Sequence, residues 1–263
     1  PRATSRASAC SPPARPARPS RQATETSTGS GGAEHTGPNH PGHRAVGGAL
    51  ITDPLALADT YLTAARHDNE VGRFEDAVDK LDQALVVLEG VPGQWPEQLR
   101  IRVLITRSWT ELEVNGLGPA LLMLRAARAR AAVIDDHLLL ALSQVQEGVI
   151  HVRGGDWAAA LAALDGVGGD VVELNASQRC ALHINRGMAH LGLGHTDDAE
   201  VDLLRAAETA AEHGLSDQEF KARHNLACLA FVDGDLARAL VLMRQADAMD
   251  AAVSRDRARL DQA

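Results

Sequence analysis

The stretch GHTDDAEVDLLRAA, which runs from Gly194 to Ala207, decides the fold because its pattern recurs along the chain. Five positions after the glycine stands an alanine, and apolar residues follow four and seven positions after that alanine. At this spacing the three side chains share one face of a helix. The glycine is typical of the left-handed residue that ends one helix shortly before the next begins. The stretch therefore predicts a turn between two helices.

The pattern occurs five times after residue 50, at a nearly constant step. The alanine after the turn falls at positions 77, 120, 160, 199 and 239, which gives steps of 43, 40, 39 and 40 residues. A fixed period of this size predicts stacked helical hairpins. Seven positions before each turn stands a small residue, at the point where the two helices of a hairpin would be closest. These small residues are Ala65, Ser108, Gly148, Gly187 and Ala227.

This pattern resembles that of the tetratricopeptide repeats, which are two-helix units with small residues at these places and a glycine-led turn. The resemblance covers about residues 55–250, although the step of about 40 is longer than the usual 34 residues. The second copy departs from the pattern, because Asn115 takes the place of the turn glycine. Asn tolerates the left-handed conformation, so we expect the turn there too. The resemblance implies an all-α, right-handed superhelical solenoid of about five hairpins.

The composition agrees with such a solenoid and divides the chain. Hydrophobic residues make up 45% of the chain and aromatic residues only 3%, so Ala, Leu and Val must form the core between closely packed helices. Residues 1–48 hold seven of the eleven prolines and show no apolar periodicity. We expect this segment to be a disordered tail. Residues 49–252 form the predicted solenoid, and residues 253–263 are expected to begin a further helix that is cut short.

Charge and cysteine content limit the possible partners and compartments. The net charge of −9 argues against direct contact with nucleic acid. The sequence shows neither a secretory signal nor a segment suited to a membrane. Its three cysteines form no paired framework, which is typical of a reduced protein. We therefore expect a cytoplasmic protein with no nucleic-acid or membrane partner.

Motifs for catalysis and for cofactor binding are missing from the sequence. It contains no phosphate-binding loop, no dinucleotide fingerprint and no HExxH zinc motif. His183 and His190 lie seven residues apart on one predicted helix and His195 follows in the turn, but we expect the first two to pack between helices. No carboxylate or cysteine completes a set with them at metal-ligand spacing. Cys180 and Cys228 are expected to be inert, buried thiols. The sequence therefore predicts no enzyme activity, no cofactor and no metal site.

The first helices of successive hairpins line a concave groove in the tetratricopeptide family, and the resemblance carries this arrangement to the present chain. The implied groove begins with polar residues and continues with apolar ones, which suits an amphipathic helix or an extended hydrophobic segment. The same side chains could instead pack against the next hairpin or against a further domain of the chain. The predicted groove residues are Arg66, Asn69, Trp109, Val149, Arg153, Ile184, Met188, Leu191, Cys228 and Phe231.

Three functions are compatible with these observations. The first is a non-catalytic interaction scaffold that binds a peptide or a partner domain in the groove. The second is the regulatory arm of a larger bacterial enzyme, because the repeats, especially residues 224–252, resemble the region that precedes a caspase-like CHAT domain in high-GC bacteria. The catalytic Cys and His of such a domain would lie outside this chain. The third is the helical part of a large transcriptional regulator, whose DNA-binding motif the sequence lacks.

Overall fold

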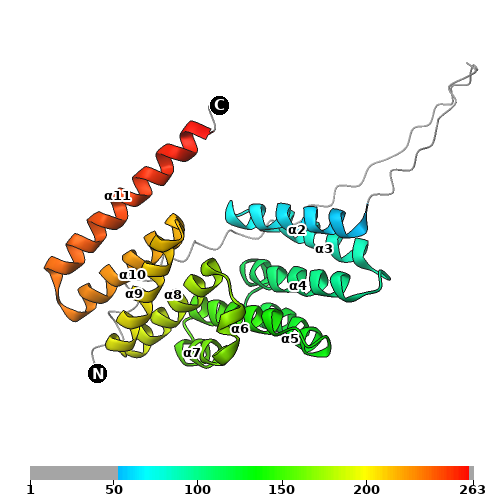
Figure 1. Ribbon diagram of the computed structural model, residues 1–263, viewed down its shortest axis with the longest axis horizontal. Helices are drawn as coiled ribbons and strands as arrows, with labels where there is room; N and C mark the ends of the chain where they lie inside the picture. The colour runs from blue at the N-terminus through cyan, green and yellow to red at the C-terminus, as the bar shows by residue number, and fades with distance from the viewer. Residues whose placement is uncertain (1–52, 261–263) are drawn as a thin grey trace, which may run out of the picture.

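The computed structural model describes residues 53–260, and this part of the chain is helical throughout, without a strand. The predicted tail at residues 1–48 lies outside the described residues. Ten α-helices follow one another and form an arch in which the first and last hairpins rise on opposite sides (Figure 1). The helices are α2 (Pro54–Glu70), α3 (Phe74–Leu88), α4 (Gln94–Asn115), α5 (Leu117–Val133), α6 (His137–Gly154), α7 (Trp157–Asp165), α8 (Ala176–Leu193), α9 (Thr196–Glu212), α10 (Ser216–Asp233) and α11 (Leu236–Leu260), with the 3-10 helix η1 (Gly168–Glu173) between α7 and α8.

Consecutive helices pack as five antiparallel hairpins, which are α2–α3, α4–α5, α6–α7, α8–α9 and α10–α11. The first helix of each hairpin also contacts the first helix of the next, from α2 and α4 through to α8 and α10. Each hairpin therefore packs mainly against its neighbours in sequence, as in a solenoid. This arrangement confirms the predicted all-α repeat architecture.

The turns within the hairpins follow the predicted pattern with one difference. Gly72, Gly155, Gly194 and Gly234 have positive φ angles between 75° and 86°. In the second hairpin, however, Asn115 stays in α4 and the positive φ of 87° falls on Gly116. The prediction that Asn115 makes this turn is therefore wrong. A glycine lacks the β-carbon that makes the left-handed conformation unfavourable, so the turn moves to the adjacent glycine.

The core lies between the two helices of each hairpin, where small residues face large ones. Ala65, Ser108 and Ala227 are buried at the predicted close contacts. In the first four hairpins the alanine after the turn and the two apolar residues that follow it are also buried. In the fifth hairpin Ala239 and Met243 are only half-buried, because no further hairpin packs against α11 within residues 53–260. The solenoid is thus well packed along its length and less so at this end.

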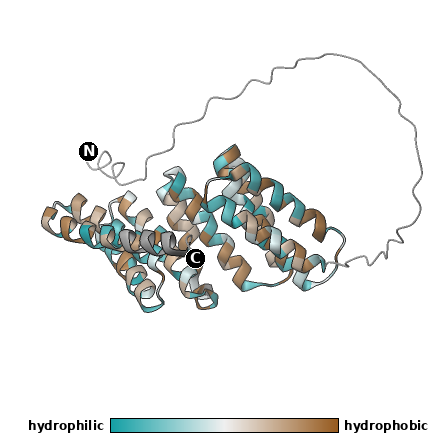
Figure 2. Cartoon of the chain, turned by 90° about the horizontal axis from the view of Figure 1, so that it is seen from above, coloured by the Kyte–Doolittle hydropathy of each residue, from teal (hydrophilic) through white to brown (hydrophobic). Residues whose placement is uncertain are grey.

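Helix α11 runs without a break from Leu236 to Leu260, so the boundary predicted at residue 252 falls inside it. It extends well beyond the end of α10 (Figure 1). Hydrophobic and hydrophilic residues are interleaved along the helices and do not form one long apolar run (Figure 2). Accordingly, none of the helices within residues 53–260 combines the length and the hydropathy needed to span a membrane.

Candidate interaction surface

The ten predicted groove residues lie on the first helices of the five hairpins, but their exposure differs. Arg66, Arg153 and Phe231 are exposed. Asn69, Trp109, Val149 and Met188 are half-buried, and Ile184, Leu191 and Cys228 are buried. Seven of the ten residues therefore retain surface that a partner could contact.

Ile184, Leu191 and Cys228 belong to the core, so their placement in an exposed groove is wrong. Ile184 packs with Leu203 of α9 and Leu226 of α10. Leu191 packs with Leu229 of α10 and is only 4% exposed. The family register places these residues on the inner side of α8 and α10, but the direct contact between these two helices covers that side. Sequence reasoning missed this because the spacing between successive hairpins is not encoded in the repeat pattern.

The N-terminal end of this surface carries two arginines that the fold does not use. Arg66 of α2 and Arg102 of α4 are exposed, and neither forms a salt bridge within the described residues. Loss of solvation among the surrounding helices, and then the positive charge of Arg102, lower the pKa of the Arg66 guanidinium, and the charge of Asp59 only partly opposes them. Close by, Thr110 donates a hydrogen bond of 3.1 Å to the side-chain oxygen of Asn69. The two arginines therefore form a positive site, and the neighbouring Asn69 is held by the fold.

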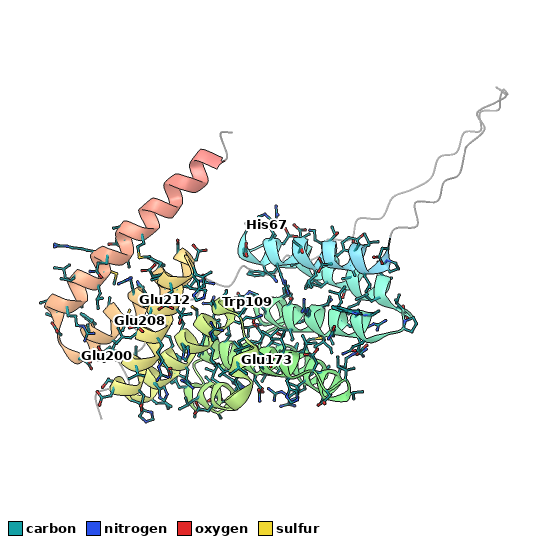
Figure 3. All side chains as sticks on the ribbon, viewed as in Figure 1. His67, Trp109, Glu173, Glu200, Glu208 and Glu212 are labelled. Atoms are coloured by element: carbon teal, nitrogen blue, oxygen red, sulfur yellow. The ribbon has the colours of Figure 1, made fainter. Side chains whose placement is uncertain are left out.

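The middle of the surface is apolar and partly supported by the core. Figure 3 shows Trp109 near the middle of the arch, between the N-terminal hairpin and the fourth and fifth hairpins. Val149 packs against the core of the third hairpin, and Met188 packs against the cluster that contains Leu191. Arg153 lies 3.4 Å from Glu113, so its charge is paired. This part of the surface therefore offers apolar contacts.

The C-terminal end exposes apolar side chains besides the predicted Phe231, which stands at the end of α10 and is 49% exposed. Leu236, Leu240 and Val241 at the start of α11 are more than half exposed. The spacing of Leu236 and Leu240 could have indicated them, since residues four apart share a helix face. The spacing does not show, however, whether another helix covers this apolar face or leaves it exposed.

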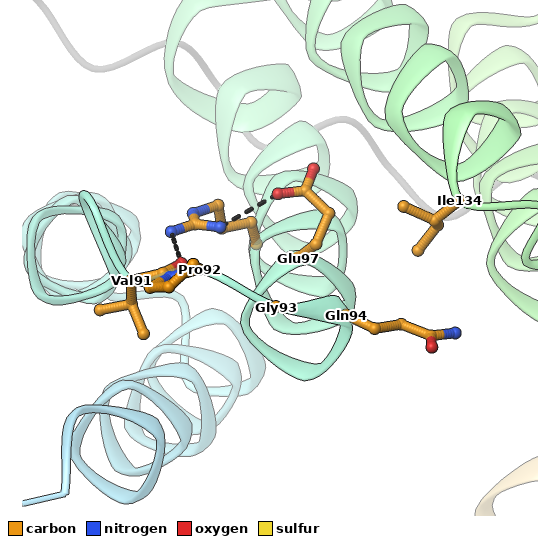
Figure 4. A pocket seen from close by; sticks show the side chains of 7 residues that line it. Val91, Pro92, Gly93, Gln94, Glu97 and Ile134 are labelled. Carbon is orange, nitrogen blue, oxygen red and sulfur yellow. Dashed lines mark hydrogen bonds and ion pairs between the residues drawn. The ribbon is translucent and has the colours of Figure 1, made fainter.

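Outside this surface, a shallow hollow of about 540 Å³ lies beside the connection between α3 and α4 (Figure 4). Arg100 donates hydrogen bonds there to the carbonyl oxygens of Leu88 and Val91, and it pairs with Glu97. Hydrogen bonds from Arg130 and then from Arg100 outweigh the effect of burial and lower the pKa of the Glu97 carboxyl. These charges are used to fix the connection, so the hollow offers no reactive group.

A second buried cluster lies between α8 and α9. His183 and His190 lie 2.9 and 3.9 Å from the carboxylate of Asp202, which confirms that both histidines face the partner helix of their hairpin. Arg186 donates two hydrogen bonds of 2.7 Å to the same carboxylate. Burial raises the pKa of Asp202, but the hydrogen bonds from Arg186 and His183 outweigh it and bring the pKa down to about 2. Asp202 is therefore a buried carboxylate that stays charged at neutral pH and holds α8 to α9.

Two cysteines and one group of histidines are further candidates for reactive side chains among residues 53–260. Cys180 is buried, and burial raises the pKa of its thiol, as expected for an inert cysteine. His190, His195 and Asp198 form a group whose ligand atoms all lie within 4.8 Å of one another. The expectation that no carboxylate completes a ligand set near His190 is therefore wrong. Asp198 lies on the next helix, beyond the reach of spacing rules for a single helix.

Solved structures share the arrangement of hairpins. A crystal structure of the nearly identical TPR-like repeats of a protein described as a kinesin light chain of Podosopora anserina has a TM-score of 0.55 and 18% sequence identity, over 78% of this chain and 100% of that chain. A variant of those repeats has a TM-score of 0.56 and 19% identity, over 77% of this chain and 98% of that chain. At these identities the likeness shows a common fold. Models of known families and curated proteins give no match.

Proposed function

We propose that this chain is a non-catalytic interaction scaffold whose concave surface binds a peptide or a partner domain. The observation that supports the proposal most directly is that two arginines on the first helices form no hydrogen bond with other described residues. Of the eight arginines on α2, α4, α6, α8 and α10, six form side-chain hydrogen bonds to other residues of the range 53–260 and two form none there. The two are Arg66 and Arg102, which lie at one end of the surface.

These two arginines favour a partner that carries an acidic group. Loss of solvation is the main effect that lowers the pKa of Arg66, and repulsion by Arg102 adds to it. A bound carboxylate would offset this repulsion, because an opposite charge favours the charged form. Guanidinium groups also bind carboxylates with two parallel hydrogen bonds. The full clamp by which some tetratricopeptide proteins hold a terminal carboxylate is not reproduced, since Leu62, Ile105 and Thr106 stand at its other positions. An acidic side chain of the partner is therefore the expected ligand.

The remainder of the surface favours apolar contacts along the same partner. Trp109 is half-buried and Phe231 is exposed, in a chain that contains only seven aromatic residues other than histidine. Aromatic anchors of this kind carry a large share of the binding energy in many interfaces. The proposed ligand is therefore an extended or helical segment with an acidic residue near one end and apolar residues along its length.

The test compares charge reversal on the two sides of the solenoid. Partners are captured from a lysate with the wild type and with the double variant Arg66→Glu, Arg102→Glu. The matched control is Arg125→Glu, Arg205→Glu, since these two arginines are exposed on the second helices α5 and α9. We expect the first double variant to lose the captured partner and the control to keep it.

The site of contact is then located by a photoreactive residue in place of Trp109, with the same residue in place of the exposed Val133 as the control. Cross-linking from position 109 and not from position 133 supports the concave surface. Equal cross-linking from both positions, or equal capture by all variants, would place the binding surface elsewhere.

The alternative of a regulatory arm, for a CHAT-type protease or a transcriptional regulator, stays a prediction. In that arrangement the concave surface would hold a domain of the same polypeptide. The captured partner in the experiment above would then compete with that domain for Trp109 and the two arginines.

A further inference from the structure

The turn of the fourth hairpin brings together three side chains from two helices. His190 lies in the last turn of α8, and the backbone then reverses at Gly194, which has a φ of 82°. His195 stands immediately before α9, and Asp198 is the third residue of that helix. The left-handed turn thus places two imidazoles and one carboxylate within 4.8 Å of one another. We call this group the hairpin-turn site.

The distance between the two imidazoles matches that of two ligands on one metal ion. The Nδ1 atoms of His190 and His195 are 3.4 Å apart, and the rings are tilted by 48° with their centroids 5.7 Å apart. Zinc–nitrogen bonds of about 2.0–2.1 Å at the tetrahedral angle separate two nitrogen atoms by about 3.3–3.4 Å. A direct hydrogen bond between the rings would be shorter, at about 3 Å. The separation of the two Nδ1 atoms therefore suits two ligands of one ion.

The second nitrogen of His190 faces a carboxylate that the fold holds in place. Its Nε2 atom lies 3.9 Å from the Asp202 carboxylate, which is buried and hydrogen-bonded by Arg186. Metal-binding histidines usually direct their other ring nitrogen to such a carboxylate, which orients the ring and raises its basicity. This contact is independent of the distance between the imidazoles and points to the same ligand atom of His190.

We propose that the hairpin-turn site binds one divalent transition-metal ion of the zinc class through His190, His195 and Asp198. Two imidazoles and one carboxylate are the donors that Zn²⁺ prefers, whereas Ca²⁺ and Mg²⁺ take oxygen ligands. Asp198 is exposed and can rotate towards the ion, and a water molecule completes the tetrahedron. The ion connects the end of α8 to the start of α9 and stabilises the folded hairpin by binding to it preferentially.

The binding experiment uses the full chain and titrates it with Zn²⁺ by calorimetry, then with Co²⁺, whose visible absorption reports four-coordinate geometry. The site variants are His195→Ala and Asp198→Asn, both at exposed positions. Their matched controls are His213→Ala, at the other end of α9, and Asp197→Asn, next to Asp198. We expect each site variant to weaken binding by about tenfold or more and both controls to bind as the wild type does.

The histidines at positions 35, 40 and 43 offer a second source of metal binding, so the titration is repeated with all three replaced by alanine. The proposal requires that binding, the Co²⁺ spectrum and a metal-dependent rise in melting temperature all persist in that variant. Loss of the three signals there, or equal binding by site variants and controls, would show adventitious binding by other histidines of the chain and overturn the proposal.

Discussion

Gly187 of α8 lies so close to Leu203 of α9 that a β-carbon on the glycine would be 2.8 Å from the Cγ atom of the leucine and 3.2 Å from the carbonyl oxygen of Ala199. The leucine side chain occupies the space that a larger residue at position 187 would need. This contact explains why a small residue recurs seven positions before each turn. It allows the two helices of the hairpin to approach as closely as the core requires.

Replacing Gly187 by alanine should therefore destabilise the protein. We expect a loss of about 1–3 kcal/mol in the free energy of unfolding, because the leucine or the backbone of α9 must move. The measurement is urea unfolding followed by circular dichroism. Gly118→Ala in α5 is the matched control, since a β-carbon there meets nothing within 4 Å. That control should be neutral or gain up to about 1 kcal/mol from its helix propensity. Equal effects of the two substitutions would contradict the close packing.

The stability of the protein should fall in acid through Asp202. Its carboxyl has a folded-state pKa of about 2, against an ordinary value of 3.8. A carboxyl whose pKa is lower in the folded state stabilises the fold above the unfolded-state pKa, and this contribution is lost as the pH falls from about 4 to about 2. The difference corresponds to about 2–3 kcal/mol. Urea unfolding at a series of pH values measures this contribution.

The variant Asp202→Asn provides the comparison for the acid prediction. It leaves Arg186 and the neighbouring histidines without their carboxylate, so at pH 7 we expect a loss of about 3–5 kcal/mol. Between pH 4 and pH 2 the variant should lose less stability than the wild type loses. An identical slope in the two proteins over that interval would mean that Asp202 does not titrate as stated.

Leu191 and Phe231 should respond very differently to the same substitution. Leu191→Glu places a charge in the cluster with Ala199 and Leu229, where it has no partner, and we expect a loss of more than about 3 kcal/mol or failure to fold. Phe231→Glu changes a side chain that is 49% exposed, and we expect a change below about 1 kcal/mol. The melting temperatures of the two variants, measured by circular dichroism, should therefore differ clearly, with the lower value for Leu191→Glu. Similar melting temperatures for the two variants would contradict the burial of Leu191 and favour its exposure.

Arg100 and Arg102 stand two residues apart on α4 and offer a matched pair. Arg100→Leu removes the side-chain donor to the carbonyl oxygen of Val91 and one of the two donors to that of Leu88, so we expect a loss of about 1–3 kcal/mol. Arg102→Leu removes an exposed side chain that forms no salt bridge within the described residues, and we expect a change within about 0.5 kcal/mol. Urea unfolding of the two variants should rank them in this order. The reverse order would contradict the assigned role of Arg100.

The repeat pattern predicted the hairpins because each hairpin is built by local rules. A glycine such as Gly194 ends a helix, and the spacing of Ala199 and Leu203 creates an apolar face. The packing of one hairpin on the next follows no such rule. Gly192 of α8, for example, lies directly against the ring of Trp157 in α7, so closely that a β-carbon would overlap the indole. The repeat pattern contains neither residue.

The same limit explains the errors at the candidate sites. The repeat register gives the side of a helix on which a residue stands, but it does not give the distance to the next hairpin. Ile184 and Cys228 were therefore assigned to an exposed surface that α8 and α10 cover together. The hairpin-turn site was missed for a related reason. Its ligands lie on both sides of Gly194, and their proximity depends on the angle at which α9 leaves the turn.

Because each hairpin packs mainly against its neighbours in sequence, most tertiary contacts join residues that are near in the chain. Chains with such local contacts fold rapidly, and unfolding can begin at one end and advance hairpin by hairpin. Most described side chains of α11 are exposed, so we expect α11 to open more readily than the central hairpins. Amide protons should therefore exchange in a gradient, fastest in α11 and slowest in the central hairpins. The described hairpins would therefore open progressively and not as one rigid block.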